Sequence, residues 1–485
     1  MSILQKARQY EESHIDDIDS KPEFHVSPVI GWLNDPNGFS LYQEEVHLFY
    51  QYHPYDTEWG PMHWGHYKTD DFIKWEYLPI AIAPDEEYDL IGCFSGSAIE
   101  HDGKHVLFYT GVTESESSNN GSEILQNQCI AIGDGIDYQK PKENPIIDGE
   151  LLPEGFSNID FRDPKVWKED DVFHMVVANR NNDGKGQILL FQSDTLMNWK
   201  FTTVLMEYKK QFGNMWECPD FFKLDSKHIL IISPQDMMAR DLEYHNGNNV
   251  VYFLGEYNKE QHVFEDETSY AVDYGLDFYA PQTMQAADGR RILIGWMQSW
   301  DTKLKGADHN WVGMMTIPRE LKLINNRLIQ TPVREIEQYR HNKVNYVDYE
   351  IKGYTYVEGI SGRTIDMMID LLNGEYSTFD ISFAQNEDYR VYCSYNKKDN
   401  ILKFDRKYSG LHRDIICERE VKLASNTLKN IRVLLDKYSA EIFINDGEQV
   451  LSSLYFTPLE AKDIQFYCDG SVNINIEKFD IIVHR

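Results

Sequence analysis

The chain has 485 residues, of which 42% are hydrophobic, so it can bury the cores of two domains. Its formal net charge of −32 argues against nucleic acid or an anionic membrane surface as a partner. The six cysteines lie far apart, without a Cys-x-x-Cys pair or zinc-ligand spacing, and they predict free thiols and no metal site.

The first 24 residues are expected to form an extension in front of the first domain. They are charged and lack the apolar run of a secretory signal, and no later run is apolar and long enough to span a bilayer. We therefore expect a cytoplasmic protein without a membrane partner. The sequence leaves open whether the protein is a monomer or a homodimer.

An internal repeat spans residues 25–332, where we expect the first domain. Short apolar strands, each preceded by a polar turn, begin 59, 67, 56 and 63 residues apart and cover residues 46–51, 105–111, 172–178, 228–233 and 291–296. In phase with them, Thr69-Asp70 is followed by Trp75 as Ser193-Asp194 is followed by Trp199. Five such units predict an all-β fold with a five-bladed β-propeller, and the alternative is an ordinary pair of β-sandwiches.

The repeat ends after Pro332, and the rest of the chain is expected to form a second domain. Residues 333–342 are charged, have helical character and predict a linker. Residues 343–485 return to strand-like alternation without the repeat, and Asn445-Asp446-Gly447 predicts a tight turn. This pattern predicts a C-terminal β-sandwich.

Three carboxylates stand in unusual local settings within the repeat. Asp35 lies in Asn34-Asp-Pro-Asn-Gly38, where Asn34 and Asn37 can donate hydrogen bonds that keep a carboxylate ionised, as a nucleophile requires. The other interpretation of this run is a simple polar turn. Asp163 stands before Pro164 and between Arg162 and Lys165, which should favour its ionised form, although an isolated surface ion pair would look the same.

Glu217 lies in Trp216-Glu-Cys-Pro-Asp220. We expect Trp216 and Cys218 to surround this carboxyl with apolar atoms and to raise its pKa, as a general acid at neutral pH requires. We further expect the Cys218 thiol to tune that pKa. A carboxylate held ionised and another made more basic correspond to the nucleophile and the acid/base of glycoside hydrolysis.

These three motifs, in this order, resemble those of glycoside hydrolase family 32, which includes invertases, sucrose-6-phosphate hydrolases and exo-acting fructan hydrolases. The resemblance also covers Phe94-Ser-Gly-Ser97, Asp277-Phe-Tyr-Ala-Pro-Gln282 and Met315-Thr-Ile-Pro-Arg-Glu-Leu321, and it extends into the C-terminal part of the chain. It implies a five-bladed propeller with an appended β-sandwich, in agreement with the repeat. It also implies a retaining β-fructofuranosidase that uses no cofactor and no metal.

By the same resemblance, Asp35 would attack the anomeric carbon of a fructosyl unit, Glu217 would act as acid and base, and Asp163 would stabilise the transition state. The other expected contacts to the sugar are Asn34, Gln51, Trp59, Phe94, Ser95, Arg162 and Tyr279. Trp64 is a further candidate, whereas Trp296, at a strand end, is expected to pack between strands.

Two other functions remain open at this stage. A fructosyltransferase would use the same carboxylates but transfer fructose to another sugar, and a non-catalytic sugar-binding propeller would lack at least one of them. The expected partner is a small sugar: sucrose, sucrose 6-phosphate or a short fructo-oligosaccharide. A phosphorylated substrate would need local cations, for which Lys303, Lys305 and Arg180 are candidates.

Overall fold

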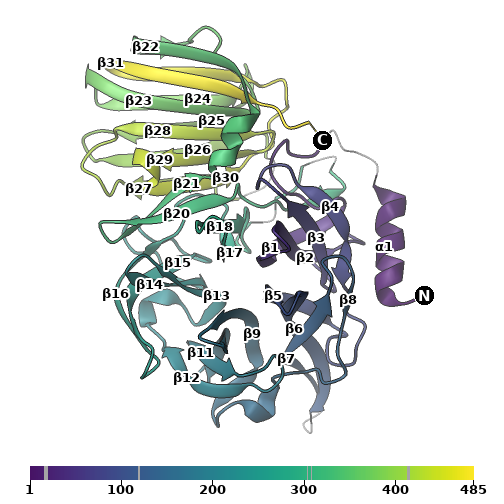
Figure 1. Cartoon of the computed structure of the whole chain (residues 1–485). Coiled ribbons are helices and arrows are strands. Elements are labelled where there is room, and N and C mark those ends of the chain that lie inside the picture. The colour runs from purple at the N-terminus through teal and green to yellow at the C-terminus, as the bar shows by residue number, and fades with distance from the viewer. Residues whose placement is uncertain (16–19, 118–120, 303, 307–308, 412–414, 485) are drawn as a thin grey trace.

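The computed structural model describes residues 1–485 except 16–19, 118–120, 303, 307–308, 412–414 and 485. The chain forms a five-bladed β-propeller followed by a β-sandwich (Figure 1). The N-terminal helix α1 (Ile3–His14) lies outside the propeller against its first blade, where the Arg8 Nε donates to the Ile80 carbonyl over 2.9 Å. No helix among the described residues is long and apolar enough to cross a membrane.

Each blade is a sheet of antiparallel strands taken in chain order from the centre outwards. The strands of blades 1 to 3 are β1 (Gly31–Tyr42), β2 (Glu45–His53), β3 (His63–Thr69), β4 (Glu76–Ile82), then β5 (Gly92–His101), β6 (Lys104–Ser117), β7 (Gly121–Gly133), β8 (Tyr138–Gln139), then β9 (Phe156–Glu169), β10 (Val172–Asn181), β11 (Gly186–Ser193), β12 (Lys200–Met206). Those of blades 4 and 5 are β13 (Met215–Leu224), β14 (Lys227–Gln235), β15 (Val251–Asn258), β16 (Val263–Ala271), then β17 (Tyr279–Gln285), β18 (Arg291–Trp296), β20 (Arg319–Ile324), β21 (Arg327–Pro332). The short strand β19 (Trp311–Val312) pairs in parallel with β1 and so joins the last part of the propeller to the first.

The five repeated strands of the sequence are the second strands of the five blades, β2, β6, β10, β14 and β18. These strands are buried on both faces, which explains why they are apolar at almost every position rather than at every second one. The paired motifs at Trp75 and Trp199 are the turns between the third and fourth strands of blades 1 and 3, and each indole nitrogen donates to a carbonyl three residues earlier. The predicted propeller is confirmed, and the alternative of two sandwiches is wrong.

The innermost strands β1, β5, β9, β13 and β17 surround the central axis (Figure 1). Each of them has a break in the pairing register with the second strand of its blade, at the place where the sequence motifs lie. In blades 3 to 5 this bulge includes a residue with positive φ: Asp163 (66°), Cys218 (49°) and Ala280 (48°). A bulge re-aims the side chains beside it, so here it selects which motif residues point to the axis.

A short 3-10 helix (Arg334–Tyr339) leads from the propeller into the sandwich. The sandwich strands are β22 (Arg340–Thr355), β23 (Ile365–Glu375), β24 (Thr378–Gln385), β25 (Arg390–Asn396), β26 (Ile401–Tyr408), β27 (Glu418–Lys422), β28 (Asn430–Asp436), β29 (Ser439–Ile444), β30 (Gln449–Leu454) and β31 (Asp463–Ile481). The long strand β31 pairs with β24 through its first half and with β23 through its second half, and thereby joins the two layers. The predicted turn at Asn445–Gly447 connects β29 to β30.

Charged side chains are buried where the two domains meet. The His25 imidazole lies 2.8 Å from Asp436 Oδ2 and 2.9 Å from Glu441 Oε1, both on the sandwich. Arg319, from blade 5, donates from Nε to Glu441 Oε2 over 3.1 Å and pairs with Asp273 at 2.9 Å. Because all five side chains are buried and mutually paired, this interdomain network fixes the sandwich to the propeller.

Candidate active site

A cavity of about 340 Å³ lies where the first halves of the innermost strands meet. We call it the reaction cavity, and its lining is Asn34, Asp35, Gln51, Trp59, Phe94, Ser95, Gln126, Arg162, Asp163, Glu217, Gln235 and Trp300. The structure thus brings nine of the ten predicted site residues together from four blades. The tenth, Tyr279 on β17 of the fifth blade, is fully buried and reaches the cavity through Glu217.

Asp35, on β1, is held by two neutral donors. Ser95 Oγ donates to Asp35 Oδ2 over 2.7 Å, and Asn34 Nδ2 donates to Oδ1 over 3.1 Å. Burial raises the pKa of Asp35, the charge of Glu217 raises it further, and the two donors oppose this. The predicted role of Asn37 is wrong: its Oδ1 accepts from the Gly96 backbone at 3.3 Å, across the blade boundary.

Asp163, on β9, shares its surroundings with Asp35. The backbone N–H of Cys218 donates to Asp163 Oδ2 over 2.9 Å, and the Cys218 thiol lies 3.6 Å from Asp163 Oδ2 and 3.7 Å from Asp35 Oδ2. Burial raises the pKa of Asp163 to about 7, although Arg162 lowers it. The expected contact with Lys165 is wrong, because the Lys165 side chain leaves the strand elsewhere and pairs with Asp220 at 3.2 Å.

Glu217, on β13, has polar partners on both carboxylate oxygens. Arg162 donates to Oε1 from Nε at 3.2 Å and from Nη2 at 3.1 Å, while Gln235 and Tyr279 donate to Oε2 at 2.7 and 2.8 Å. The predicted apolar surround is therefore wrong. Trp216 points to the other face of the strand, where its indole donates to Phe212, because neighbouring side chains on a strand alternate. The Cys218 thiol lies against Asp35 and Asp163 instead.

Aromatic rings form the rim of the reaction cavity. Trp59 is 46% exposed and packs edge-on against Phe94 at 5.9 Å, and Trp300 is 39% exposed and stacks on Trp32 at 6.3 Å. Exposed flat rings at the mouth of a polar pocket suit the C–H faces of a sugar. Trp296 is fully buried among these rings, as predicted, whereas Trp64 is buried in the propeller core and is not part of the cavity.

Three lining residues were not predicted: Gln126, Gln235 and Trp300. Gln126 Oε1 accepts from the Phe161 backbone at 2.8 Å and so fixes the start of the Arg162 motif. Gln235 stands at the end of β14, two residues after one of the repeated apolar strands, and that position was the signal available in the sequence. Trp300 follows β18 in the same way, four residues after Trp296.

The three candidate cations for a phosphate lie elsewhere or outside the described residues. Lys303 is outside the residues that the structure describes. Arg180 pairs with Asp160 at 3.4 Å and Lys305 donates to Thr57 over 2.9 Å, and neither of them lines the reaction cavity. Among the described lining residues Arg162 is the one cation, and it is already bonded to Glu217 and to Asp160 at 2.9 Å.

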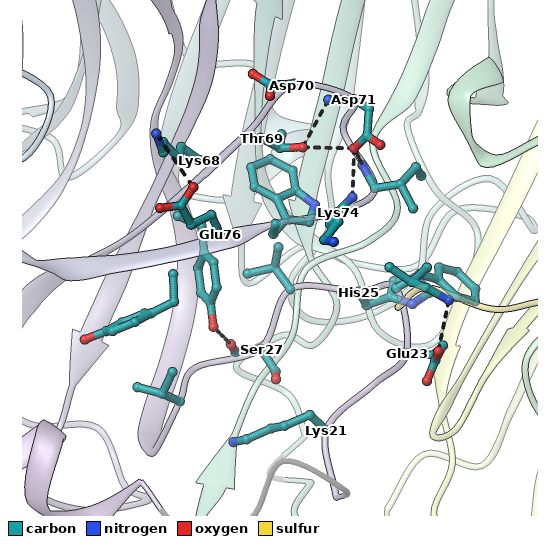
Figure 2. A pocket seen from close by; sticks show the side chains of 18 of the residues that line it. Lys21, Glu23, His25, Ser27, Lys68, Thr69, Asp70, Asp71, Lys74 and Glu76 are labelled. Atoms are coloured by element: carbon teal, nitrogen blue, oxygen red, sulfur yellow. Dashed lines mark hydrogen bonds and ion pairs between the residues drawn. The ribbon is translucent and has the colours of Figure 1, made fainter. Parts of the chain in front are cut away.

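A larger cavity, of about 650 Å³, lies beside blade 1 and includes Val483 in its lining (Figure 2). Its walls are mainly apolar, and several of its charged groups are paired with each other, for example Lys68 with Glu45 at 2.8 Å. Asp35, Asp163 and Glu217 all lie outside it. The smaller reaction cavity, which gathers these carboxylates, is therefore the candidate active site.

Comparisons with known proteins agree with this geometry. The family models "Glycosyl hydrolases family 32 N-terminal domain" and "Glycosyl hydrolases family 32 C terminal" match residues 25–332 and 335–482. The sucrose-6-phosphate hydrolase of Escherichia coli is 36% identical over 457 residues, 93% of each chain, and its raffinose invertase is 35% identical over 455 residues, 92% of this chain and 91% of that one. The structure of a family 32 β-fructofuranosidase from Bombyx mori matches with a TM-score of 0.85 and 32% identity, covering 99% of this chain and 98% of that one. The chain belongs to glycoside hydrolase family 32.

Proposed function

We propose that this protein is a retaining β-fructofuranosidase, which hydrolyses the terminal β-D-fructofuranosyl bond of sucrose-type sugars through a covalent fructosyl-enzyme. The observation that carries the proposal is that Asp35 and Glu217 line one cavity with different hydrogen-bond partners. Asp35 meets only uncharged donors, whereas Glu217 meets a guanidinium and two further donors. Such a difference assigns different tasks to two carboxylates.

The partners of Glu217 support its role as acid and base. Arg162 donates twice to Oε1, which disfavours a proton on that oxygen, so the exchangeable proton of the neutral acid is carried by Oε2. The Tyr279 hydroxyl lies 2.8 Å from Oε2 and 2.9 Å from the Ser233 carbonyl oxygen. Because a hydroxyl has one proton, Tyr279 donates to Oε2 when Glu217 is ionised and to Ser233 when Glu217 is protonated. It therefore has a good partner in both states of the acid/base.

The proposed reaction has two steps. Asp35 attacks the anomeric carbon of the fructosyl unit while Glu217 gives its proton to the bridging oxygen, so the remaining sugar leaves with a hydroxyl group. Glu217 then takes a proton from water, the water oxygen bonds to the anomeric carbon, and the bond to Asp35 breaks. Asp163 and Asp35 both contact the Cys218 thiol and so lie close together. When it is ionised, Asp163 stabilises the positive charge that develops on the sugar ring.

The substrate is proposed from the relatives and from charge. A variant of the Bombyx mori enzyme has been solved in complex with sucrose, at 31% identity to this chain, and the E. coli relatives are named for sucrose 6-phosphate and raffinose. These three sugars share a terminal fructosyl unit. The described lining of the reaction cavity holds three carboxylates, and its one cation, Arg162, is already paired with Glu217. Because the carboxylates would repel a phosphate, this lining favours uncharged sucrose over sucrose 6-phosphate. Six free thiols, five of them buried, suit action in a reducing cytoplasm.

The proposal is tested by solvolysis and by a substrate series. With sucrose in dilute methanol, we expect methyl β-D-fructofuranoside beside fructose, and the α-anomer as the product would contradict the covalent intermediate. The values of kcat/KM for sucrose, sucrose 6-phosphate, kestose and inulin then rank the substrates. A fructosyltransferase would instead release mainly kestose from concentrated sucrose, with little free fructose.

A further inference from the structure

The family motifs also place residues at the far end of the central axis, away from the reaction cavity. A second cavity of about 630 Å³, the distal chamber, is lined by the later halves of the same five innermost strands. Lys165 lies two residues after Asp163, and Asp220 lies three residues after Glu217. Gln282 bridges the axis between the two ends, since it donates to the Gly96 carbonyl at 2.6 Å and accepts from the Phe39 backbone at 3.3 Å. The distal chamber and the reaction cavity have no lining residue in common.

Asp220 brings an unsatisfied acceptor to the distal chamber. Its Oδ2 accepts from the Thr283 backbone at 2.6 Å and lies 3.2 Å from the Lys165 ammonium. Its Oδ1 has no hydrogen-bond partner among the described residues, although the residue is only 1% exposed. A buried carboxylate oxygen without a donor is costly, so a ligand or solvent group that donates a hydrogen bond is expected here.

Arg291 and Lys165 bring positive charge to the same place. Within the part of the chain that the structure describes, no carboxylate lies within ion-pair distance of Arg291. Its guanidinium covers the Phe222 ring at 4.7 Å and has Thr283 Oγ1 at 3.5 Å. The Lys165 ammonium donates to the Thr283 carbonyl at 2.6 Å and faces Asp220, which leaves one of its three N–H groups for another acceptor. With Asp220 counted, these three groups leave one net positive charge, although the whole lining is neutral because Lys168 and Lys223 stand against Glu100, Glu169 and Asp225.

We propose that the distal chamber is a second binding site, for a small phosphorylated polyol such as a hexose phosphate. The phosphate pairs with Arg291, whose fork of N–H groups matches two phosphate oxygens, and with the remaining N–H of Lys165. A hydroxyl group of the same ligand donates to Asp220 Oδ1. Water alone would satisfy Asp220 but would leave Arg291 with the charge of Asp220, beyond ion-pair distance, as its counter-charge. The volume lies within the range of small-molecule sites. Burial lowers the pKa of both cations, and a bound anion would offset that cost.

The site is tested with glucose 6-phosphate, inorganic phosphate and glucose as probes, titrated into the full chain by calorimetry. Two matched substitutions separate the ends of the axis: Arg291→Gln removes the guanidinium of the distal chamber, and Arg162→Gln removes the guanidinium of the reaction cavity. Arg390→Gln, on the exposed face of the sandwich, controls for net charge. Circular dichroism and thermal melting check that each variant is folded, and Arg291→Lys is a milder second variant.

We expect saturable binding of glucose 6-phosphate that Arg291→Gln weakens by roughly tenfold or more, the equivalent of one charge-assisted hydrogen bond. Arg291→Lys should weaken it less, and Arg162→Gln and Arg390→Gln should leave it within about twofold of the original chain. Inorganic phosphate should bind several-fold more weakly than the hexose phosphate, because it lacks the additional sugar hydroxyls, and glucose should not bind. The proposal is overturned if the original chain shows no saturable binding, or if Arg162→Gln abolishes binding that Arg291→Gln preserves. Equal affinity for the two phosphates would remove the role of Asp220.

Discussion

The reaction cavity and the interdomain network both bury carboxylates, but the pKa values of Asp163 in the cavity and of Asp436 in the network move in opposite directions. In the network, burial acts to raise the pKa of Asp436, yet the hydrogen bond and charge of His25 outweigh it and hold the pKa at about 2. In the reaction cavity, burial raises the pKa of Asp163 to about 7 despite the neighbouring Arg162. Burial alone therefore does not decide the state of a carboxyl group.

The difference lies in the supply of cations. The network gives Asp436 and Glu441 a shared imidazolium in His25, and Glu441 a guanidinium in Arg319. The reaction cavity offers three carboxylates one described cation, which is bound to Glu217. Two cations for three carboxylates make the network a structural connection, whereas one cation for three carboxylates leaves the reaction cavity costly and reactive. Substitutions that remove one carboxylate from each region should therefore have opposite consequences.

The largest effect is expected for Asp35→Asn. Turnover of sucrose should fall by about 10³-fold or more, because the amide cannot form the bond to the sugar. The melting temperature should stay the same or rise, since burial disfavours the charge that the substitution removes. Steady-state kinetics and thermal melting measure both. Near-normal turnover by the purified variant would contradict the proposed nucleophile, and a large loss of stability would contradict the comparison.

The reverse result is expected for Asp436→Asn. This change leaves His25 charged and buried beside a neutral amide, so the free energy of unfolding should fall by about 3–5 kcal/mol. The value of kcat per folded molecule should be unchanged, because Asp436 lies in the sandwich and outside the reaction cavity. Denaturant unfolding and kinetics on the same preparation provide the test. A variant as stable as the original chain would mean that the network does not hold the domains together.

The dependence of stability on pH should come from histidines of two kinds. Burial acts to lower the pKa of His25, but its two carboxylate partners raise it to about 9. Its contribution is therefore complete below the unfolded value of about 6.5 and is lost as pH rises towards 9, up to about 3 kcal/mol. Burial lowers the pKa of His47 and His63 to about 4, so their contribution is present above pH ~6.5 and is lost as pH falls from there to 4.

The histidines therefore act to lower the melting temperature on both sides of a maximum near neutral pH, while the raised pKa of Asp163 opposes the decline on the acid side. In His25→Gln the maximum should be lower and the decline on the alkaline side should largely disappear, while the decline on the acid side remains. His14→Gln, in the exposed helix α1, is the matched control and should reproduce the original curve. An alkaline decline of the same size in His25→Gln would exclude the network as its origin.

The sequence predicted the fold well because the signal for it is local. The second strand of every blade is buried on both faces, so five apolar runs stand out whatever the loops between them contain. The motifs likewise predicted which carboxylates meet. The predicted neighbours of these carboxylates were wrong where a shift of one residue in strand register decides which way a side chain points. The bulges at Asp163 and Cys218 turn Lys165 away from Asp163. Strand alternation points Trp216 away from Glu217. Sequence neighbours are therefore poor guides to the surroundings of a side chain on a bulged strand.

The smallest effect is expected for Cys218, which was predicted to tune Glu217 but lies against Asp35 and Asp163. A thiol is a weak donor, and its loss in Cys218→Ala should make the ionised form of Asp35 slightly less favourable. The acid limb of the profile of kcat/KM against pH, which reports ionisation of the nucleophile, should move up by about half a unit, the equivalent of ~0.7 kcal/mol. The alkaline limb of the same profile should not move.

Cys468→Ala is the matched control, because that thiol is equally buried but lies in the sandwich. It should leave both limbs in place. If Cys218→Ala instead shifted the alkaline limb and left the acid limb unchanged, the thiol would act on the acid/base after all. The division of the reaction cavity into a nucleophile side around Cys218 and an acid/base side around Arg162 and Tyr279 would then be wrong, because that division assigns the thiol to Asp35 and Asp163.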